Sequence, residues 1–395
     1  MPSESGNRRV IPFFDYSHVF TSQEEELLEI IREVGRRGAF ILQRDVEQLE
    51  RDLAAYVGAK HVVGVANATD GLWMALRAAG VGPGQEVILC SHSMVAAAAA
   101  IHFTGATPIP VECGPDHLID PAAVAAAVTP RTSAILPTHL NGRTCDMDAL
   151  GAIADRHGLV IVEDAAQALS SKFKGRSAGT FGAGGAVSFY PAKTLGCLGD
   201  GGCVITNDAA VYEKLLLYRD HGRNAKGDVV LWAMNSRLDN LQAAVLGFKL
   251  RQYDHVVARR RELAGIYDEQ LRALPGLRLP PGPDADPDRF DIYQNYEIES
   301  ERRDELRAFL EARGVGTLVQ WGGKAVHQLR RLGFTQRLPY TEKLFARMLL
   351  LPMNTSLSDD DVVYVCQCTR EFCQRAWPPT PRGPRPANRT DTANE

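Results

Sequence analysis

The sequence of 395 residues lacks a long hydrophobic run and a strong excess of either charge. No apolar stretch reaches the ~18 residues that a membrane-spanning helix needs. A net charge of -4 provides no electrostatic attraction to nucleic acid or to an anionic membrane surface. The composition therefore predicts neither nucleic acid nor a membrane as a partner.

We also expect no secretory signal in the first 20 residues. The apolar stretch IPFFDYSHVF is interrupted by Pro12, Asp15 and His18, and no suitable cleavage site follows it. Eight cysteines in a chain of this length indicate reduced thiols rather than a disulfide framework. We expect a cytoplasmic protein.

The sequence shows no pattern of metal ligands. The one tight group of cysteines, Cys366, Cys368 and Cys373, has no histidine nearby, so it does not resemble a zinc site. Val365, Cys368 and Phe372 share one face of a predicted helix. We expect these cysteines to pack in the core, and we predict no metal.

Two nucleotide-binding loops are excluded at the glycine-rich stretch around Lys193. A Walker loop needs glycine directly before its lysine and again five residues earlier, where Ala192 and Val187 stand. A dinucleotide fingerprint that begins at Gly182 meets Val187 where its last glycine belongs. Neither motif accounts for this lysine.

The stretch from Val162 to Asn207 offers a different chemistry. Asp164 ends an apolar run, a second run ends at Tyr190, and Lys193 follows in a glycine-rich turn. Pyridoxal phosphate needs an amine for its aldehyde and a carboxylate for its ring nitrogen. On these residues alone, a surface lysine and an acid that caps a helix stay open as alternatives.

Alternating strand and helix patterns predict an α/β fold with a mostly parallel sheet covered on both faces. The predicted strands are His61 to Val65, Glu86 to Cys90, Thr107 to Val111, Ser133 to Pro137, Leu159 to Val162, Ala186 to Tyr190 and Cys203 to Thr206. Ligands of such sheets gather beyond the carboxyl ends of the strands. Asn67, Thr69, Asp164 and Lys193 all fall at or just after predicted strand ends.

Helix signals flank this region. Ser22 is the predicted cap of a helix that begins with three acids, and a second helix is predicted from Val46 to Tyr56. Asn235 is predicted to open a helix with an apolar face, and a long basic helix is predicted from His255 to Leu274.

Five separated blocks carry a family resemblance. They are NATDGLWMALRAAGVGPGQEVI from Asn67, EDAAQA from Glu163, SFYPAKTLGCLGDGGCVITND from Ser188, NSRLDNLQAA from Asn235 and the closing LLLPMNTSLSDDDV. Over about residues 20 to 375 the chain resembles the DegT/DnrJ/EryC1/StrS sugar aminotransferases. The resemblance implies the aspartate aminotransferase fold (fold type I), with pyridoxal 5'-phosphate as cofactor.

The resemblance also implies roles for individual residues. Lys193 would hold the cofactor and Asp164 would pair with the ring nitrogen. The remaining predicted cofactor contacts are Ala68, Thr69 and Ser188 at the phosphate, Met94 and Gln167 at the ring faces, and Asn235 at the phosphate of a neighbouring subunit. Asn235 thus implies a homodimer with shared active sites. Ala68 and Met94 depart from the family's usual glycine and aromatic residue, and local sequence alone also allows Asn235 to be a helix cap.

We predict a large cofactor-binding domain over 1–250, a smaller α+β domain over 251–376 and a disordered tail over 377–395. The Pro/Gly/Asp segment LPPGPDADPDRF is predicted to separate the long basic helix from the α+β unit. In the smaller domain, the loop QWGGKAVHQ supplies three candidate substrate contacts, Trp321, Lys324 and His327.

The resemblance favours amino transfer from glutamate to a nucleotide-linked keto-deoxysugar, with Lys193 and Asp164 as catalytic residues. The expected reaction is amination of dTDP-4-keto-6-deoxy-D-glucose at carbon 4 to dTDP-4-amino-4,6-dideoxy-D-glucose. Amination at carbon 3 or of a cyclitol ketone would use the same residues. A non-catalytic relative that senses cofactor or sugar nucleotide is the alternative of a different class.

Overall fold

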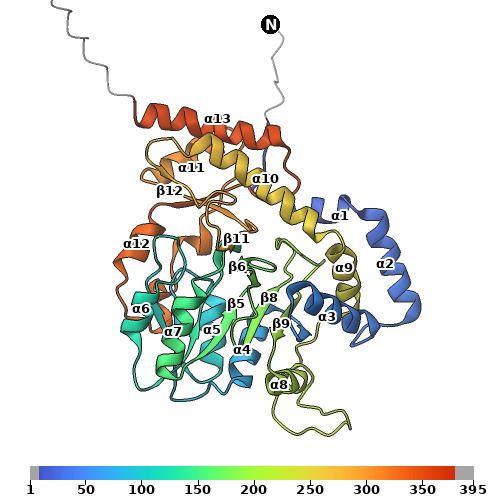
Figure 1. Ribbon diagram of the computed structural model, residues 1–395. Coiled ribbons are helices and arrows are strands. Elements are labelled where there is room, and N and C mark those ends of the chain that lie inside the picture. Colours follow the sequence, from blue (N-terminus) through green and yellow to red (C-terminus); the bar gives the residue numbers. More distant parts are fainter. Residues whose placement is uncertain (1–8, 379–395) are drawn as a thin grey trace, which may run out of the picture.

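A seven-stranded sheet forms the centre of the computed structural model, which describes residues 9–378 (Figure 1). Its spatial order is β1-β9-β8-β5-β4-β2-β3, and β9 alone runs antiparallel to both of its neighbours. The strands are β1 (His61–Val65), β2 (Glu86–Cys90), β3 (Thr107–Val111), β4 (Thr132–Leu136), β5 (Val160–Asp164), β8 (Gly184–Ser188) and β9 (Gly202–Thr206). The predicted mostly parallel sheet is confirmed, and the first three strands have the predicted bounds.

Side chains that alternate along the strands build separate cores on the two faces of the sheet. On β9, Val204 packs in one cluster, whereas Cys203 and Ile205 pack in another. The first face is covered by α4 (Ala68–Ala78), α5 (Val95–Phe103) and α8 (Ala209–Arg219). The second face is covered by α3 (Arg44–Val57), α6 (Pro121–Ala127), α7 (Met147–His157) and α9 (Asn240–Leu250).

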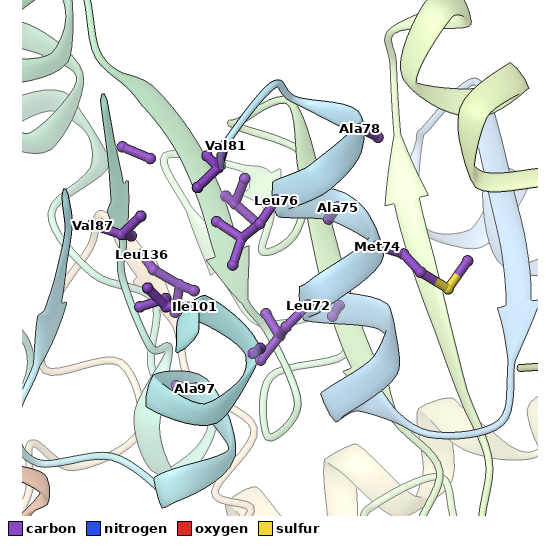
Figure 2. Packing of buried hydrophobic residues seen from close by; sticks show 14 of the residues in the cluster. Leu72, Met74, Ala75, Leu76, Ala78, Val81, Val87, Ala97, Ile101 and Leu136 are labelled. Carbon is purple, nitrogen blue, oxygen red and sulfur yellow. The ribbon is translucent and has the colours of Figure 1, made fainter. Parts of the chain in front are cut away.

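Helix α4 lies at the centre of the first core, as Figure 2 shows. Leu72 and Leu76 of this helix pack in one cluster with Ile101 of α5 and Leu136 of β4. All four side chains are at most 2 % exposed. This packing fixes α4 against the sheet and therefore fixes the position of its N-terminus.

Two predicted helix starts are wrong. Ser22 ends α1 (His18–Thr21), and the acidic helix α2 (Glu24–Arg37) starts after Gln23. Asn235 does not open a helix, because α9 starts at Asn240 with Asp239 as its N-cap residue.

The C-terminal part of the chain has its own core. Its elements are β10 (Leu277–Arg278), β12 (Tyr296–Ser300), β13 (Met348–Leu351), α11 (Arg303–Glu311) and α13 (Asp359–Ala376). Helix α12 (Pro339–Phe345) packs instead against the second face of the large sheet, through Leu344 and Phe345. Cys366, Cys368 and Cys373 are buried in the C-terminal core, which confirms their predicted packing role.

The long helix α10 (Tyr253–Leu271) joins the two parts (Figure 1). Tyr253 packs in a core of the large sheet, whereas Leu263 packs in the C-terminal core, which also contains Ile11. The division into 1–250 and 251–376 stays a prediction. The predicted disordered tail falls, from residue 379 onward, outside the described residues.

Short elements complete the fold. The predicted separating segment contains β11 (Arg289–Phe290), which pairs with β6 (Lys172–Phe173), and β6 pairs with β7 (Arg176–Ser177). The 3-10 segments are η1 (Leu140–Gly142), η2 (Gln320–Gly323), η3 (Val326–Gln328) and η4 (Arg330–Leu332). Across residues 9–378, no helix combines the length and apolar character that crossing a membrane requires. The same residues contain no group of three or more His, Cys, Asp or Glu side chains that could hold a metal ion.

Candidate active site

The start of α4, directly after β1, forms one side of the site. Asn67 is the N-cap residue, and its Oδ1 accepts the backbone N–H of Asp70 at 2.9 Å. Within residues 9–378 the N–H groups of Ala68 and Thr69 donate no hydrogen bond. Because the first turn of a helix carries free donors and partial positive charge, this end of α4 can bind an anion.

The strands β8 and β9 come close to this helix start. Ser188 ends β8 and lies opposite Gly202 of β9. A Cβ atom at Gly202 would lie 2.7 Å from the carbonyl carbon of Asn67 and 2.8 Å from the nitrogen of Ala68. Only glycine allows this approach without displacing the backbone of the anion-binding turn.

Asp164 is the last residue of β5 and is 5 % exposed. Its Oδ1 accepts the N–H of Ala166 at 3.1 Å, and its Oδ2 accepts the hydroxyl of Thr138 at 3.2 Å. Burial raises the pKa of Asp164, whereas these hydrogen bonds and the charge of Lys193 lower it. A buried carboxyl group in this balance is suited to pair with a cationic group, which would favour its ionised form.

Lys193 lies in the turn after β8, where its backbone N–H donates to the carbonyl of Tyr190 at 2.8 Å. Burial lowers the pKa of Lys193 from 10.5 to about 8, although the charge of Asp164 acts in the opposite direction. More of this amine is therefore uncharged near neutral pH than in an exposed lysine. The uncharged amine is the nucleophilic form.

A cavity of about 320 Å³ brings these groups together. Its lining includes Asn67, Ala68, Thr69, Met94, Asp164, Gln167, Ser188 and Lys193. All cofactor-binding residues predicted from the sequence thus line one cavity, with the exception of Asn235.

The side chain of Gln167 is oriented by a hydrogen bond with the backbone of Asn141. Its Oε1 accepts the backbone N–H of Asn141 at 2.8 Å, so its NH2 group remains available on the other side. Asn141 has a left-handed backbone with φ of 57°, which asparagine tolerates better than most residues. The Asn141 side chain accepts from Asn295 at 2.9 Å and from Gln320 at 2.6 Å, and it donates to Glu297 at 3.3 Å.

A second cavity of about 510 Å³ shares Gln167, Tyr190, Lys193 and Trp321 with the first. Its other walls are largely aromatic and apolar, and they include Phe13, Phe14, Tyr16, Leu318 and Met353. Trp321 has a left-handed φ of 53°, and its indole Nε1 is buried without a hydrogen-bond partner among residues 9–378. The two cavities together provide space beyond Lys193 for a second ligand.

Two of the predicted substrate residues lie elsewhere. The ring of His327 is 0 % exposed, with Nδ1 at 2.6 Å from the hydroxyl of Ser91 and Nε2 at 3.2 Å from Glu342. These contacts make His327 a structural residue that anchors its loop. Lys324 is exposed and lines neither cavity. Only Trp321 of the three predicted substrate residues therefore lies at the site.

Asn235 also lies outside the cavities of its own chain. It is exposed and forms an isolated bridge with Asp220, in the segment between α8 and α9. The same segment presents Trp232, which is 100 % exposed, and Val229, which is 66 % exposed.

Pyridoxal 5'-phosphate fits the donor set of the first cavity. The free N–H groups at the start of α4, together with Ser188, would hold its phosphate. Asp164 would pair with the ring nitrogen, and Lys193 would bind the aldehyde carbon. Each charged part of this cofactor thus meets a group of complementary chemistry.

A mixed sheet of this order, with Asp164 and Lys193 at adjoining strand ends, defines a pyridoxal-phosphate-dependent transferase of fold type I. The model of the DegT/DnrJ/EryC1/StrS aminotransferase family matches residues 21–370, and the chain belongs to this family. The cofactor of the family is pyridoxal 5'-phosphate.

Three comparisons illustrate the relationship. The dTDP-3-amino-3,4,6-trideoxy-alpha-D-glucose transaminase of Streptomyces venezuelae is 41 % identical, over 92 % of this chain and 97 % of that protein. The erythromycin biosynthesis sensory transduction protein EryC1 of Saccharopolyspora erythraea is 40 % identical, over 90 % and 97 %. The crystal structure of S. venezuelae DesV with a ketimine intermediate superposes with a TM-score of 0.88 at 41 % identity, and the match covers 93 % of this chain and 99 % of that one.

Several residues at the cavities were not predicted from the sequence. Phe14 and Tyr16 lie in a stretch that was considered only as a possible signal. Thr138, which lines the first cavity, and Asn141, which contacts Gln167, follow β4, so the rule that ligands gather at strand ends could have identified them. Gln294, which lines the second cavity, gives no local sequence signal, because it contacts the backbone of Thr194, 100 residues away.

Proposed function

We propose that the protein transfers an amino group from glutamate to a nucleotide-linked keto-deoxysugar. The observation that supports this proposal best is the single cavity that contains Lys193, Asp164 and the free N–H groups of α4. Membership in an aminotransferase family supports a role in amino transfer for all of these groups.

When bound, pyridoxal phosphate supplies an aldehyde for the amino group and a ring that withdraws electrons from the reacting carbon. Lys193 would hold the cofactor by its Nζ, and the same Nζ, when free, would take the proton from the donor carbon and give it to the sugar carbon. Asp164 would favour the protonated ring nitrogen by its negative charge, and the start of α4 would hold the phosphate.

The position of amination is proposed as carbon 3 of a dTDP-linked sugar. The expectation from resemblance was carbon 4, with carbon 3 as the alternative. The S. venezuelae relative carries a 3-amino product in its name, and it supports carbon 3 because it matches nearly the whole chain. Glutamate as the donor comes from the resemblance alone.

The sugar nucleotide is proposed to occupy the second cavity. Its walls include Phe14, Tyr16, Tyr190 and Trp321. Aromatic faces pack against the apolar faces of sugar rings and bases, and the buried Nε1 of Trp321 offers a hydrogen-bond donor. The shared lining residue Lys193 would then face both cofactor and substrate.

We also propose a cytoplasmic homodimer with shared active sites. The exposed Asn235 and Trp232 belong to a segment whose apolar side chains lack cover in a single chain. A partner chain would bury these side chains and bring Asn235 to the phosphate site of the other subunit.

A panel of 3-keto and 4-keto nucleotide sugars with glutamate tests this function. Product mass and NMR identify the aminated carbon. We expect turnover of a 3-keto dTDP-sugar. Amination at carbon 4 alone would overturn the proposed position. Tight binding of sugar nucleotide or cofactor without any turnover across the panel would instead favour a sensing role.

A further inference from the structure

Gln294 holds the backbone on both sides of Lys193. Its Oε1 accepts the backbone N–H of Thr194 at 2.9 Å, and its Nε2 donates to the carbonyl of Ala192 at 2.9 Å. Gln294 is 6 % exposed and lies two residues before β12, about 100 positions along the chain from the turn that it contacts. One buried amide group therefore bridges the two neighbours of the proposed cofactor lysine.

The orientation of this amide is unambiguous. The N–H of Thr194 can only donate and the carbonyl of Ala192 can only accept, so the oxygen and nitrogen of Gln294 cannot be exchanged. Both partners are main-chain groups of the turn. The contact therefore constrains the backbone from which Lys193 projects, rather than its flexible side chain.

Gln294 is itself held rigidly. The buried guanidinium of Arg260, on α10, donates to the carbonyl oxygens of Tyr293 at 2.9 Å, Gln294 at 3.1 Å and Met353 at 3.1 Å. These contacts fix the main chain of Gln294 against the C-terminal core. The side chain of Gln294 then holds the turn around Lys193 in a fixed place relative to that core.

On the other side, the hydroxyl of Thr194 lies 2.7 Å from that of Tyr253, which donates to the carbonyl of Leu169 at 2.9 Å. This contact holds the side chain of Thr194 and leaves its backbone N–H to Gln294. Gln294 is thus the sole acceptor of that N–H within residues 9–378.

We propose that Gln294 is a positioning residue for Lys193, which sets where the amine stands relative to Asp164 and the start of α4. The proposal rests on the proposed aminotransferase function for the importance of that placement. A displacement of about 1 Å at a reacting group can slow a reaction roughly 100-fold, so a clamp on this turn has direct catalytic consequences.

The test compares Gln294→Leu with Gln242→Leu. Leucine keeps the approximate size but removes both amide contacts. Gln242 is a matched control, because its Oε1 accepts the N–H of Leu198 at 2.8 Å, in the same turn but away from Lys193. Hydrogen exchange on the cofactor-free protein measures directly how well the N–H of Thr194 is protected by Gln294. We expect faster exchange at Thr194 in Gln294→Leu only.

The second measurement concerns Lys193. In Gln294→Leu we expect the rate of pyridoxal phosphate capture and kcat to fall about 10- to 100-fold, with little change in the KM for the keto sugar. Gln242→Leu should stay close to the wild-type values. Unchanged exchange at Thr194 would overturn the proposal. Faster exchange with normal capture and kcat would also overturn it, as would equal losses in both variants. A wild-type protein that neither captures cofactor nor turns over would instead defeat the proposed function.

Discussion

The pKa values of the two ionisable groups at the site, Asp164 and Lys193, are shifted in opposite directions from their ordinary values. Burial raises the pKa of the carboxyl group of Asp164 and lowers that of the amine of Lys193. Burial therefore favours the uncharged form of each. A cationic ring nitrogen beside Asp164 would lower the pKa of its carboxyl group again and favour the ionised form. The lowered pKa of Lys193 already favours the nucleophilic, uncharged amine.

Replacing Asp164 by asparagine should leave cofactor binding largely intact but slow turnover by about 100-fold or more. The amide keeps the size and the hydrogen-bonding ability of the side chain but cannot stabilise a proton on the ring nitrogen. Cofactor titration and steady-state kinetics measure the two effects separately. A variant with near-normal turnover would mean that another group has this role.

The pH dependence of cofactor capture should report Lys193. Because the uncharged amine reacts, the rate of capture by the cofactor-free protein should rise with pH and level off above about 8, the lowered pKa of this lysine. Stopped-flow absorbance over a pH series measures it. A rate that continues to rise toward 10.5, the value for an exposed lysine, would show that burial does not tune this amine.

Sequence reasoning identified residues at strand ends more readily than residues that hold them. Asp164 and Lys193 could be predicted because an acid and a lysine flank short apolar runs within one stretch. Gln294 could not, because a glutamine that contacts backbone about 100 residues away has no periodicity or motif. His327 was predicted as a substrate contact from its place in a glycine-rich loop, and no sequence pattern indicated that Ser91 and Glu342 hold its ring.

At the level of elements, the junction of β1, β9 and α4 forms the proposed phosphate site. Gly202→Ala would place a Cβ against the backbone of Asn67 and Ala68, so the start of α4 must shift. We expect weaker cofactor binding and a loss of about 1–3 kcal/mol in unfolding free energy. Gly151→Ala in α7 is the control, since its Cβ would meet nothing within 4 Å. Equal cofactor affinity in both variants would argue against a phosphate site at this junction.

The strands were more predictable than the helix starts, for a physical reason. Strands β1, β2 and β3 are short, mostly apolar runs. Each begins with a polar residue (His61, Glu86 and Thr107) and is followed within two residues by another (Asn67, Ser91 and Glu112), so their bounds follow from composition. The segment at Asn235 resembles a helix start, but tertiary contacts keep it extended. Asn235 bridges to Asp220, the N–H of Ser236 donates to Arg219, and the Ser236 hydroxyl accepts from Ala66.

At the scale of the whole molecule, the proposed shared sites predict complementation. Lys193→Ala and Asn235→Ala should each be impaired as homodimers. A mixed dimer contains one site with both native residues, so its activity should recover toward about half of the native rate. Differently tagged chains, co-expressed and purified by both tags, provide this species.

The structure sharpens the control for this experiment. Because Asn235 precedes α9 and caps no helix, Asn235→Ala should unfold at a temperature close to that of the wild type. A mixed dimer no more active than its parents, with the Asn235→Ala parent itself crippled, would contradict shared sites. A fully active Asn235→Ala parent would show that this asparagine is dispensable.

The order of strands and helices along the chain could be predicted from the sequence, but the contacts between distant parts of the chain could not. The alternation of strands and helices predicted the sheet, and the resemblance implied the fold type. No sequence pattern showed that the two cores share α10, or that Gln294 and Asn295, from the C-terminal part, bind Ala192 beside Lys193 and Asn141 beside Gln167. Such contacts depend on how the two parts pack together, which local patterns do not encode.

Mapping the site of cofactor attachment tests the central claim most directly. The purified protein is loaded with pyridoxal phosphate, reduced with borohydride to make the link permanent, digested and analysed by mass spectrometry. We predict that the label falls on the peptide containing Lys193 and disappears in Lys193→Ala, together with the visible absorption of the bound cofactor. A label on a different lysine, or a Lys193→Ala variant that keeps both label and turnover, would contradict the account.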